Sequence, residues 1–346
     1  GQLYEPEDSG EIAAYRESRD GQVLEEGINE AGAFAAWLAA ATSYSTHGLT
    51  LIPFYIFYSM FGFQRVGDMI WACADMMARG FLLGGTAGRT TLNGEGLQHE
   101  DGHSHILAST FPNLKSYDPA FACELAVIVR DGIRRMYQTG ENIFYYITLY
   151  NENYAMPAIP EGDAAVEGII RGAYCWQPRE GEGAPVDLLA SGSIMQQAIE
   201  AAATLRELGY APAIWSVTSY VELAREAESC ERDARLQALE ARRVPYVEAL
   251  FADCEGPVVA VTDYQKALPA SIARWMPDSY TVLGTDGFGL SETRPDLRDH
   301  FEVSSRHIVQ AALAGLHRQG RIDGATLETQ LAGLGIDVAR QDPAAR

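Results

Sequence analysis

One stretch of the sequence concentrates residue types that can transfer protons. Residues 93–105, NGEGLQHEDGHSH, hold three histidines, three carboxylates and three glycines in thirteen positions. Histidine exchanges protons readily near neutral pH, and glycine lets a backbone approach a ligand closely. This composition predicts a loop that takes part in catalysis or substrate binding.

Two other interpretations of the stretch stay open. The H-x3-H-x-H spacing of His99, His103 and His105, with carboxylates nearby, could in principle suit zinc or iron. His99 and His103 would share a face only on a helix, however, and the glycines disfavour a helix. The imidazoles can also serve only to bond backbone groups of the loop. We favour catalysis because loops with crowded charges commonly carry function.

Glu30 is a second candidate for proton chemistry. It lies in GINEAGAFAAWLAAA, which predicts a helix with a small-residue face, so its carboxylate is expected on a surface built for close packing. Glu26, four residues earlier, would lie on nearly the same face, and like charges at this spacing are mildly unfavourable. Buried carboxylates often donate or accept protons in catalysis. A solvated helix start is an equally good interpretation.

The composition limits the classes of partner. The 346 residues have 47% apolar content and a net charge of −21 from 47 acids and 26 bases, which predicts a globular protein that repels nucleic acid. A basic protein partner is compatible with that charge. The five cysteines are scattered and never form a CxxC pair, so we expect reduced thiols in a cytoplasm.

Neither a membrane span nor a secretory signal is expected. The longest apolar run, LTLIPFYIFYSMFGF, is shorter than a bilayer-spanning helix and contains proline and glycine. The first 20 residues are polar and acidic, without the apolar core of a signal peptide. We expect them to form a separate polar segment.

Helices and strands alternate in the first half of the chain. Expected helices cover 23–45, 64–80 and 119–140, and expected strands cover 49–61, 81–86 and 142–150. The strand at 49–61 is a continuous aromatic and β-branched run, typical of a strand covered on both faces. This alternation predicts a parallel, doubly wound sheet.

The same pattern restarts after a proline-punctuated acidic stretch, residues 155–168, which we interpret as a linker. Expected strands follow at 186–193, 213–219, 257–263 and 280–287, with helices at 194–209 and 305–320. The sequence therefore predicts two doubly wound α/β domains, 21–160 and 161–346.

Five segments resemble the homodimeric, thiamine-diphosphate-dependent pyruvate dehydrogenase family of bacteria. They are EGINE, PFYIFYSMFGFQR, GRTTLNGEGLQHEDGHSH, YNENYAMPA and LGTDGFG, and the likeness runs from about residue 20 to the end. The resemblance implies transketolase-like architecture, with a pyrimidine-binding domain and then a C-terminal domain. The family's N-terminal, diphosphate-binding domain has no counterpart here.

The magnesium ligands of this family are also absent. The family holds magnesium diphosphate with a GDG sequence and a later asparagine, but the only candidate here is TDGFG at 285–289, and no asparagine follows Asn153. We interpret TDGFG as a glycine turn at a strand end. We therefore expect no metal ligand in this chain, Mg²⁺ ligands outside it, and a chain that is the C-terminal part of the enzyme.

The resemblance assigns three residues to the cofactor. Glu30 would hydrogen-bond the aminopyrimidine ring nitrogen and so promote loss of the thiazolium proton. Phe61 would stack on the pyrimidine, and Arg65 would help to fix the local charge. The aromatic run alone indicates core packing for most of its residues.

Three further residues are implied on the substrate side. His99 would contact the pyruvate-derived group, Tyr58 would point its hydroxyl towards it, and Glu95 would be a weaker neighbour that also borders the cofactor. His103 and His105 would order the loop. The implied reaction is decarboxylation of pyruvate and transfer of the acetyl unit to a lipoyl group on the acyltransferase of the multienzyme complex, with a homodimer as the working enzyme.

Three rival functions remain at this point. The first is a transketolase or another 2-oxo acid dehydrogenase of the same architecture. The second is a non-catalytic assembly subunit completed by a separate chain, and the third is a histidine-loop metalloenzyme.

Overall fold

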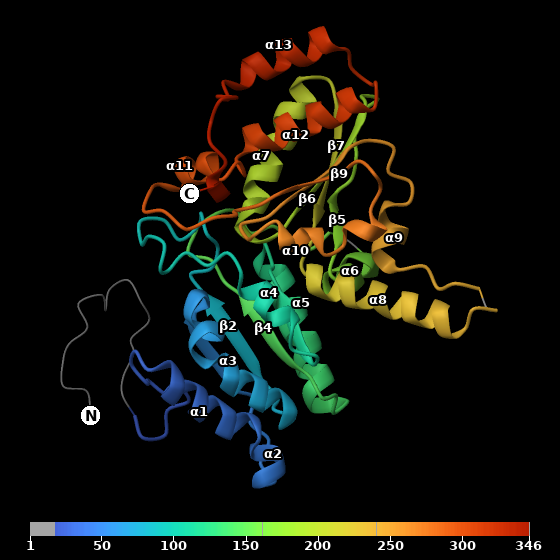
Figure 1. The fold of residues 1–346 in the computed structure, drawn as a ribbon. Coiled ribbons are helices and arrows are strands. Elements are labelled where there is room, and N and C mark those ends of the chain that lie inside the picture. The colour runs from blue at the N-terminus through green and yellow to red at the C-terminus, as the bar shows by residue number, and fades with distance from the viewer. Residues whose placement is uncertain (1–17, 161, 240, 346) are drawn as a thin grey trace.

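The computed structural model describes residues 18–160, 162–239 and 241–345, and Figure 1 shows their arrangement. The predicted polar segment 1–20 therefore lies almost wholly outside the described residues. Among the residues described, no helix is long and apolar enough to cross a membrane. The predicted α/β class with doubly wound parallel sheets is confirmed.

The first sheet has four parallel strands in the order β1-β2-β4-β3. The elements of this half are α1 (Glu30–Ala41), α2 (Ser43–Thr46), β1 (Phe54–Tyr58), α3 (Ser59–Asp75), β2 (Phe81–Gly85), α4 (Ser104–Ser109), β3 (Leu114–Tyr117), α5 (Ala122–Ile133), the π-helical turn η1 (Arg134–Gln138) and β4 (Phe144–Thr148). Helices α1 and α3 pack on one face, where Trp37 meets Phe144 and Phe63 meets Tyr146. Helix α5 covers the other face of the central strands.

The expectation that the aromatic strand is covered on both faces is wrong. Strand β1 is an edge strand, and Phe54, Ile56 and Tyr58 on one of its faces are 47%, 67% and 45% exposed. Helix α5 packs through Gly132 on Phe81 of the neighbouring strand and does not cover β1. The strand is also shorter than predicted, because the chain turns into α3 at Ser59.

The second sheet has the order β5-β7-β6-β8-β9, with β5 antiparallel and the other strands parallel. The elements are α6 (Asp163–Arg171), β5 (Tyr174–Gln177), β6 (Pro185–Ala190), η2 (Gly192–Ile194), α7 (Met195–Glu207), β7 (Ala211–Ser216), α8 (Tyr220–Leu236), α9 (Tyr246–Phe251), β8 (Val258–Val261), α10 (Ala267–Ala270), η3 (Ala273–Trp275), β9 (Tyr280–Leu283), α11 (Arg294–His300), α12 (Ser305–Arg318), α13 (Gly324–Leu334) and η4 (Pro343–Ala345). Helices α7 and α12 bury one face, and α8 and α9 bury the other.

Several local features of the structure differ from the prediction. The first helix begins at Glu30 instead of 23, because Asn29 caps it and Gly27 adopts a left-handed φ of 64°. The stretch read as a linker becomes helical from Asp163 onwards. The short strands β3 and β5 and the long helix α8 were not predicted. Edge strands of four residues leave too short a pattern to detect.

Candidate active site

The carboxyl ends of β1 and β2 bring the candidate residues to one edge of the first sheet. Tyr58 ends β1, Phe61 lies in the first turn of α3, and residues 86–103 leave the end of β2 as the segment here called the histidine loop. Ligands of open α/β sheets bind outside this edge. The topology therefore gathers segments that are far apart in the sequence.

His99, Tyr58 and Phe61 form an aromatic triad at this edge. The His99 ring lies 5.5 Å from the Tyr58 ring and 5.0 Å from the Phe61 ring, both edge-on, and the Tyr58 and Phe61 centroids are 5.9 Å apart. Edge-to-face packing at such distances is favourable for aromatic rings. Tyr58 is 45% exposed, so the triad lies at the surface, within reach of a ligand.

Glu30 and Arg65 extend the triad into a continuous cluster. Glu30 is the first residue of α1, and the Arg65 guanidinium donates to its carboxylate. The guanidinium carbon also lies 4.0 Å from the centroid of the Phe61 ring. The Glu30 carboxylate and the face of the Phe61 ring thus contact the same planar, nitrogen-bearing group, the Arg65 guanidinium.

The placement of Glu30 corrects the sequence interpretation in two ways. Its side chain is 19% exposed and ion-paired, not enclosed by a small-residue face. Glu26 lies in the exposed, non-helical segment before α1, so the two carboxylates do not share a helix face. The first helical turn favours a carboxylate, because the helix dipole is positive there.

One ring nitrogen of His99 is buried beside Glu95. Its Nδ1 is buried and has no hydrogen-bond partner, and it lies 3.7 Å from Oε2 of Glu95, which is 46% exposed. The loop around them is not helical, and Gly94 and Gly96 adopt left-handed φ values of 80° and 81°. The glycine argument against a helix is confirmed.

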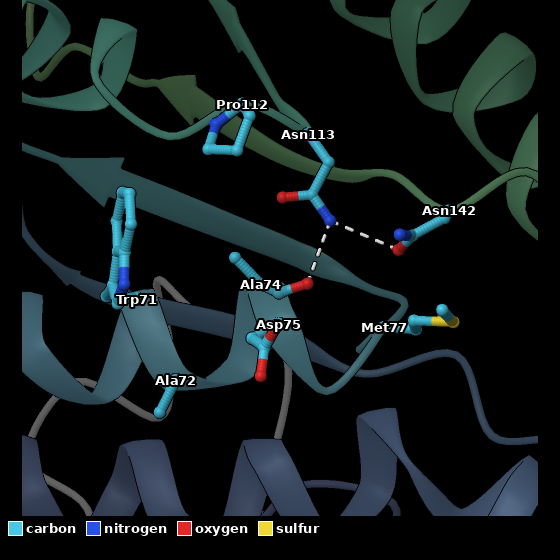
Figure 2. Close-up of a pocket in the computed structure, with 8 residues that line it drawn as sticks. All are labelled: Trp71, Ala72, Ala74, Asp75, Met77, Pro112, Asn113 and Asn142. Atoms are coloured by element: carbon cyan, nitrogen blue, oxygen red, sulfur yellow. Dashed lines mark hydrogen bonds between the residues drawn. The ribbon is translucent and has the colours of Figure 1, made fainter.

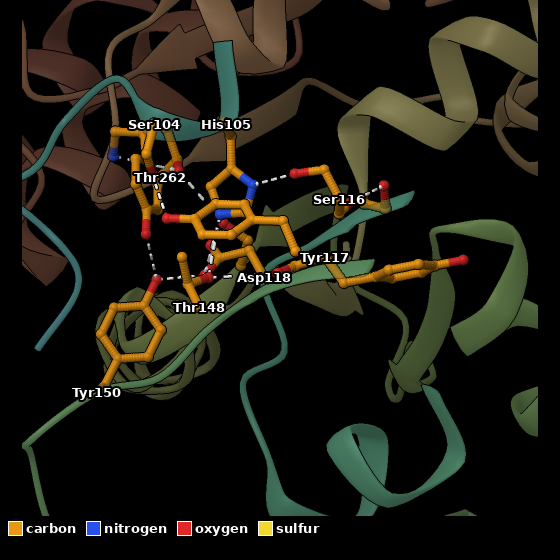
Figure 3. Close-up of polar contacts among 12 residues, drawn as sticks. Ser104, His105, Ser116, Tyr117, Asp118, Thr148, Tyr150 and Thr262 are labelled. Atoms are coloured by element: carbon orange, nitrogen blue, oxygen red, sulfur yellow. Dashed lines mark hydrogen bonds and ion pairs between the residues drawn. The ribbon is translucent and has the colours of Figure 1, made fainter. Parts of the chain in front are cut away.

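The three histidines of the loop region turn to different partners. His103 Nε2 lies 2.8 Å from Gln64 Nε2, whereas His105 is buried between Ser116 at 2.7 Å and Thr148 at 3.0 Å (Figure 3). Burial lowers the pKa of His105, which favours its neutral form. Within the described ranges, no three His, Cys, Asp or Glu side chains are placed to hold a metal ion.

The TDGFG sequence follows β9 as irregular backbone with a bend at Gly287, whose φ is 101°. Asp286 accepts a hydrogen bond from the backbone of Lys266 at 3.0 Å. Its carboxylate therefore bonds the segment that follows β8.

Two buried charged residues at the base of the loop were missed. Arg89 is 4% exposed and donates to the Thr285 carbonyl at 2.9 Å, and Glu100 is 1% exposed and accepts from the Leu290 backbone at 2.7 Å. Burial raises the pKa of Glu100 to about 7. Nothing in the local sequence distinguishes these two charges from solvated ones.

A surface pocket lies at the amino ends of the strands of the first sheet, away from the cluster of Glu30, Phe61 and His99. It is lined by the end of α3 and by the segments that precede β3 and β4, including Trp71, Asn113 and Asn142 (Figure 2). The Asn113 amide there donates to the Ala74 carbonyl and to Asn142.

Comparisons with known proteins relate the sequence of the chain to one family. Residues 1–157 match the pyruvate dehydrogenase E1 component middle domain, and residues 172–304 match the transketolase-like C-terminal domain. The pyruvate dehydrogenase E1 components of Escherichia coli K12 and Pseudomonas aeruginosa are 54% and 53% identical over 99% of this chain. The chain belongs to the pyruvate dehydrogenase E1 component family. It spans 39% of the length of these relatives.

Solved structures agree with the fold of this E1-family chain. Transketolase from Leishmania mexicana has a TM-score of 0.59 and 18% identity, over 82% of this chain and 37% of its own. An inactive β4 tetramer of a split-gene transketolase has a TM-score of 0.58 and 20% identity, over 84% of this chain and 83% of its own. At these identities the likeness concerns the fold alone.

Proposed function

We propose that this chain forms the pyrimidine-binding domain, residues 21–160, and the C-terminal domain, residues 161–346, of a thiamine-diphosphate-dependent pyruvate dehydrogenase. The enzyme decarboxylates pyruvate and transfers the acetyl unit to the lipoyl group of an acyltransferase. The observation that carries the proposal is the convergence of Glu30, Phe61, Tyr58 and His99, from three separate segments, at one edge of the first sheet.

The residues present fit the pyrimidine end of the cofactor. Arg65 bridges Glu30 and the face of Phe61 with a planar group of N–H donors. An aminopyrimidine is also planar and also presents nitrogen donors at its edge, so the same acid and the same aromatic face suit it. For the diphosphate end, no three His, Cys, Asp or Glu side chains of the described residues are placed to hold a metal ion, and we propose that its Mg²⁺ ligands lie in a domain or chain outside these residues.

The bound cofactor would supply an electron sink for the loss of carbon dioxide. Glu30 would share a proton with the pyrimidine ring, and its pairing with Arg65 would hold the carboxylate in place. Phe61 would orient the ring by stacking. Arg65, beside both, would balance the local charge.

The substrate side is served by the remaining residues. The His99 imidazole could accept or donate a proton at the pyruvate oxygens, and the Glu95 carboxylate lies 3.7 Å from its Nδ1. The Tyr58 hydroxyl belongs to an exposed ring beside His99 and could bond the same oxygens. Histidine and tyrosine thus provide polar groups on an otherwise aromatic surface.

The assay that tests this proposal uses the chain together with a diphosphate-binding domain of the family. We expect pyruvate- and lipoyl-dependent turnover that requires thiamine diphosphate and Mg²⁺. Ketol transfer between sugar phosphates, without pyruvate turnover, would show a transketolase instead. Loss of both activities in a correctly assembled complex would favour a non-catalytic assembly subunit.

The setting of the enzyme is also part of the proposal. All five cysteines are free thiols, which suits a cytoplasmic protein. We propose a homodimeric enzyme within a multienzyme complex, with the lipoyl-bearing acyltransferase as its partner. Analytical ultracentrifugation of the complete enzyme would measure the dimer directly.

A further inference from the structure

The histidine loop is held mainly by the second domain, although its own strand belongs to the first. Within the described part of the chain, the hydrogen bonds that leave residues 88–98 go to residues beyond 190, apart from two local bonds in which the Gly96 carbonyl accepts from the backbones of His99 and Glu100. In Figure 1 the loop leaves the first domain and lies beside the segments that follow β8 and β9. The second domain therefore determines where the loop lies.

Asp263, just after β8, accepts four of these hydrogen bonds through its carboxylate. Its Oδ1 accepts from the Thr90 backbone at 2.9 Å and the Thr90 hydroxyl at 2.7 Å. Its Oδ2 accepts from the Thr91 backbone at 3.1 Å and the Thr91 hydroxyl at 2.7 Å. Asp263 is fully buried, and this burial raises the pKa of its carboxyl, whereas the four donors aimed at its two oxygens lower it.

Glycines let the two domains come this close. Gly88 has a φ of 87°, and a β carbon there would lie 2.2 Å from Asp263 Oδ2. At the other end of the loop, Gly102 faces the buried Arg89, where a β carbon would lie 2.5 Å from the guanidinium carbon. The Gly102 carbonyl accepts from the Gln265 backbone at 2.8 Å. Both ends of the loop are thus fixed to residues around 263–265.

The middle of the loop is fixed by the segment after β9. The Gly94 backbone donates to Glu292 at 3.2 Å, and its carbonyl accepts from the Ser291 hydroxyl at 2.8 Å. The His99 ring contacts Tyr58 and Phe61 of the first domain. The position of that ring depends on the anchors of its backbone.

We propose that Asp263 is a positioning residue for His99. From the second domain it accepts hydrogen bonds from Thr90 and Thr91, fixes the start of the histidine loop, and so holds the His99 ring against Tyr58 and Phe61 without touching the substrate. The effect on turnover rests on the proposed function, whereas the effect on the loop does not.

The first arm of the test needs no cofactor. Asp263→Asn keeps the shape but turns an NH₂ group towards two donors, so that two hydrogen bonds are lost. In the 346-residue chain we expect amide hydrogen exchange of 88–103 to rise about tenfold or more, with β6 unchanged. The ring-current shift of the His99 resonance should also shrink. Asp253→Asn, at an exposed aspartate, is the matched control.

The second arm measures turnover with a diphosphate-binding domain present. We expect Asp263→Asn to lower kcat for pyruvate about tenfold, with a smaller change in cofactor affinity. If the wild-type complex does not turn over pyruvate, the proposed function fails while the loop arm still decides the positioning role.

A second variant covers the case in which Asp263→Asn does not fold. Thr90→Val removes one hydroxyl donor and keeps the side-chain volume, whereas Thr90→Ser retains the donor and should behave like the wild type. Unchanged exchange and an unchanged His99 resonance in Thr90→Val, or in a folded Asp263→Asn, would overturn the proposal.

Discussion

The imidazole of His99 meets the ring of Phe61 edge-on, with centroids 5.0 Å apart and planes at 73°. One residue comes from the first turn of a helix and the other from a glycine-rich loop after a different strand. The contact places a proton-transfer group beside an aromatic face, on the surface where a planar cofactor ring would lie.

His99→Ala should impair turnover more than cofactor binding. The His99 imidazole is 24% exposed beside Tyr58, so its removal should lower kcat by about 100-fold, the usual scale for a general acid or base. Cofactor affinity and pyruvate turnover are measured separately in the complete enzyme. His47→Ala, at an exposed histidine outside the site, is the control. A loss of affinity that accounts for the whole defect would move His99 to a binding role.

Glu100 should make the stability of the chain depend on pH. Burial raises the pKa of this carboxyl from 4.5 to about 7. The protonated form is therefore favoured in the folded state, so its stabilising contribution is complete below pH 4.5 and is lost as the pH rises through about 7. Glu100→Gln stays neutral throughout. We expect its Tm to fall less between pH 5.5 and pH 8.5.

Thermal unfolding followed by circular dichroism at several pH values measures this difference. Other buried titratable groups are shared by both proteins, so the difference between the two pH slopes isolates Glu100. Glu328→Gln, at an exposed glutamate, should keep the wild-type slope. Equal slopes for wild type and Glu100→Gln would show that Glu100 is not protonated in the folded chain.

The 346-residue chain alone should bind thiamine diphosphate weakly. The pyrimidine side offers one carboxylate and one aromatic stack, and the cost of immobilising a small ligand leaves about millimolar affinity. Isothermal titration calorimetry measures it directly. Addition of a domain with the GDG motif should give micromolar, magnesium-dependent binding. Micromolar, magnesium-dependent binding to the chain alone would place the diphosphate site within these residues.

Much of the architecture can be predicted from the sequence, because long alternating segments leave clear patterns. The strands around Leu188 and Val259 are apolar on both faces and were located closely. The exposure of β1 could not be predicted, since an apolar run does not reveal whether a helix covers it. The start of the first helix depended on Asn29, a capping signal inside an otherwise helical composition.

The candidate site was predicted unevenly, for a similar reason. The roles of Glu30, Phe61 and His99 come from resemblance and stay proposals, although the structure does bring these residues together. Asp263 and Arg89 carry no local signal that they clamp the histidine loop, because their partners lie more than 150 positions away. Contacts between domains are set by the tertiary fold, which periodicity cannot describe.

The proposed function depends most on Glu30 sharing a proton with the pyrimidine ring. Exchange of the cofactor's thiazolium proton with deuterium tests this role most directly. The rate is measured by NMR on acid-quenched samples of the complete enzyme saturated with thiamine diphosphate and Mg²⁺. We expect Glu30→Gln, which is nearly isosteric, to slow proton exchange and pyruvate turnover by about 100-fold or more while the fold is kept. Exchange at the wild-type rate in a folded, saturated Glu30→Gln enzyme would contradict it.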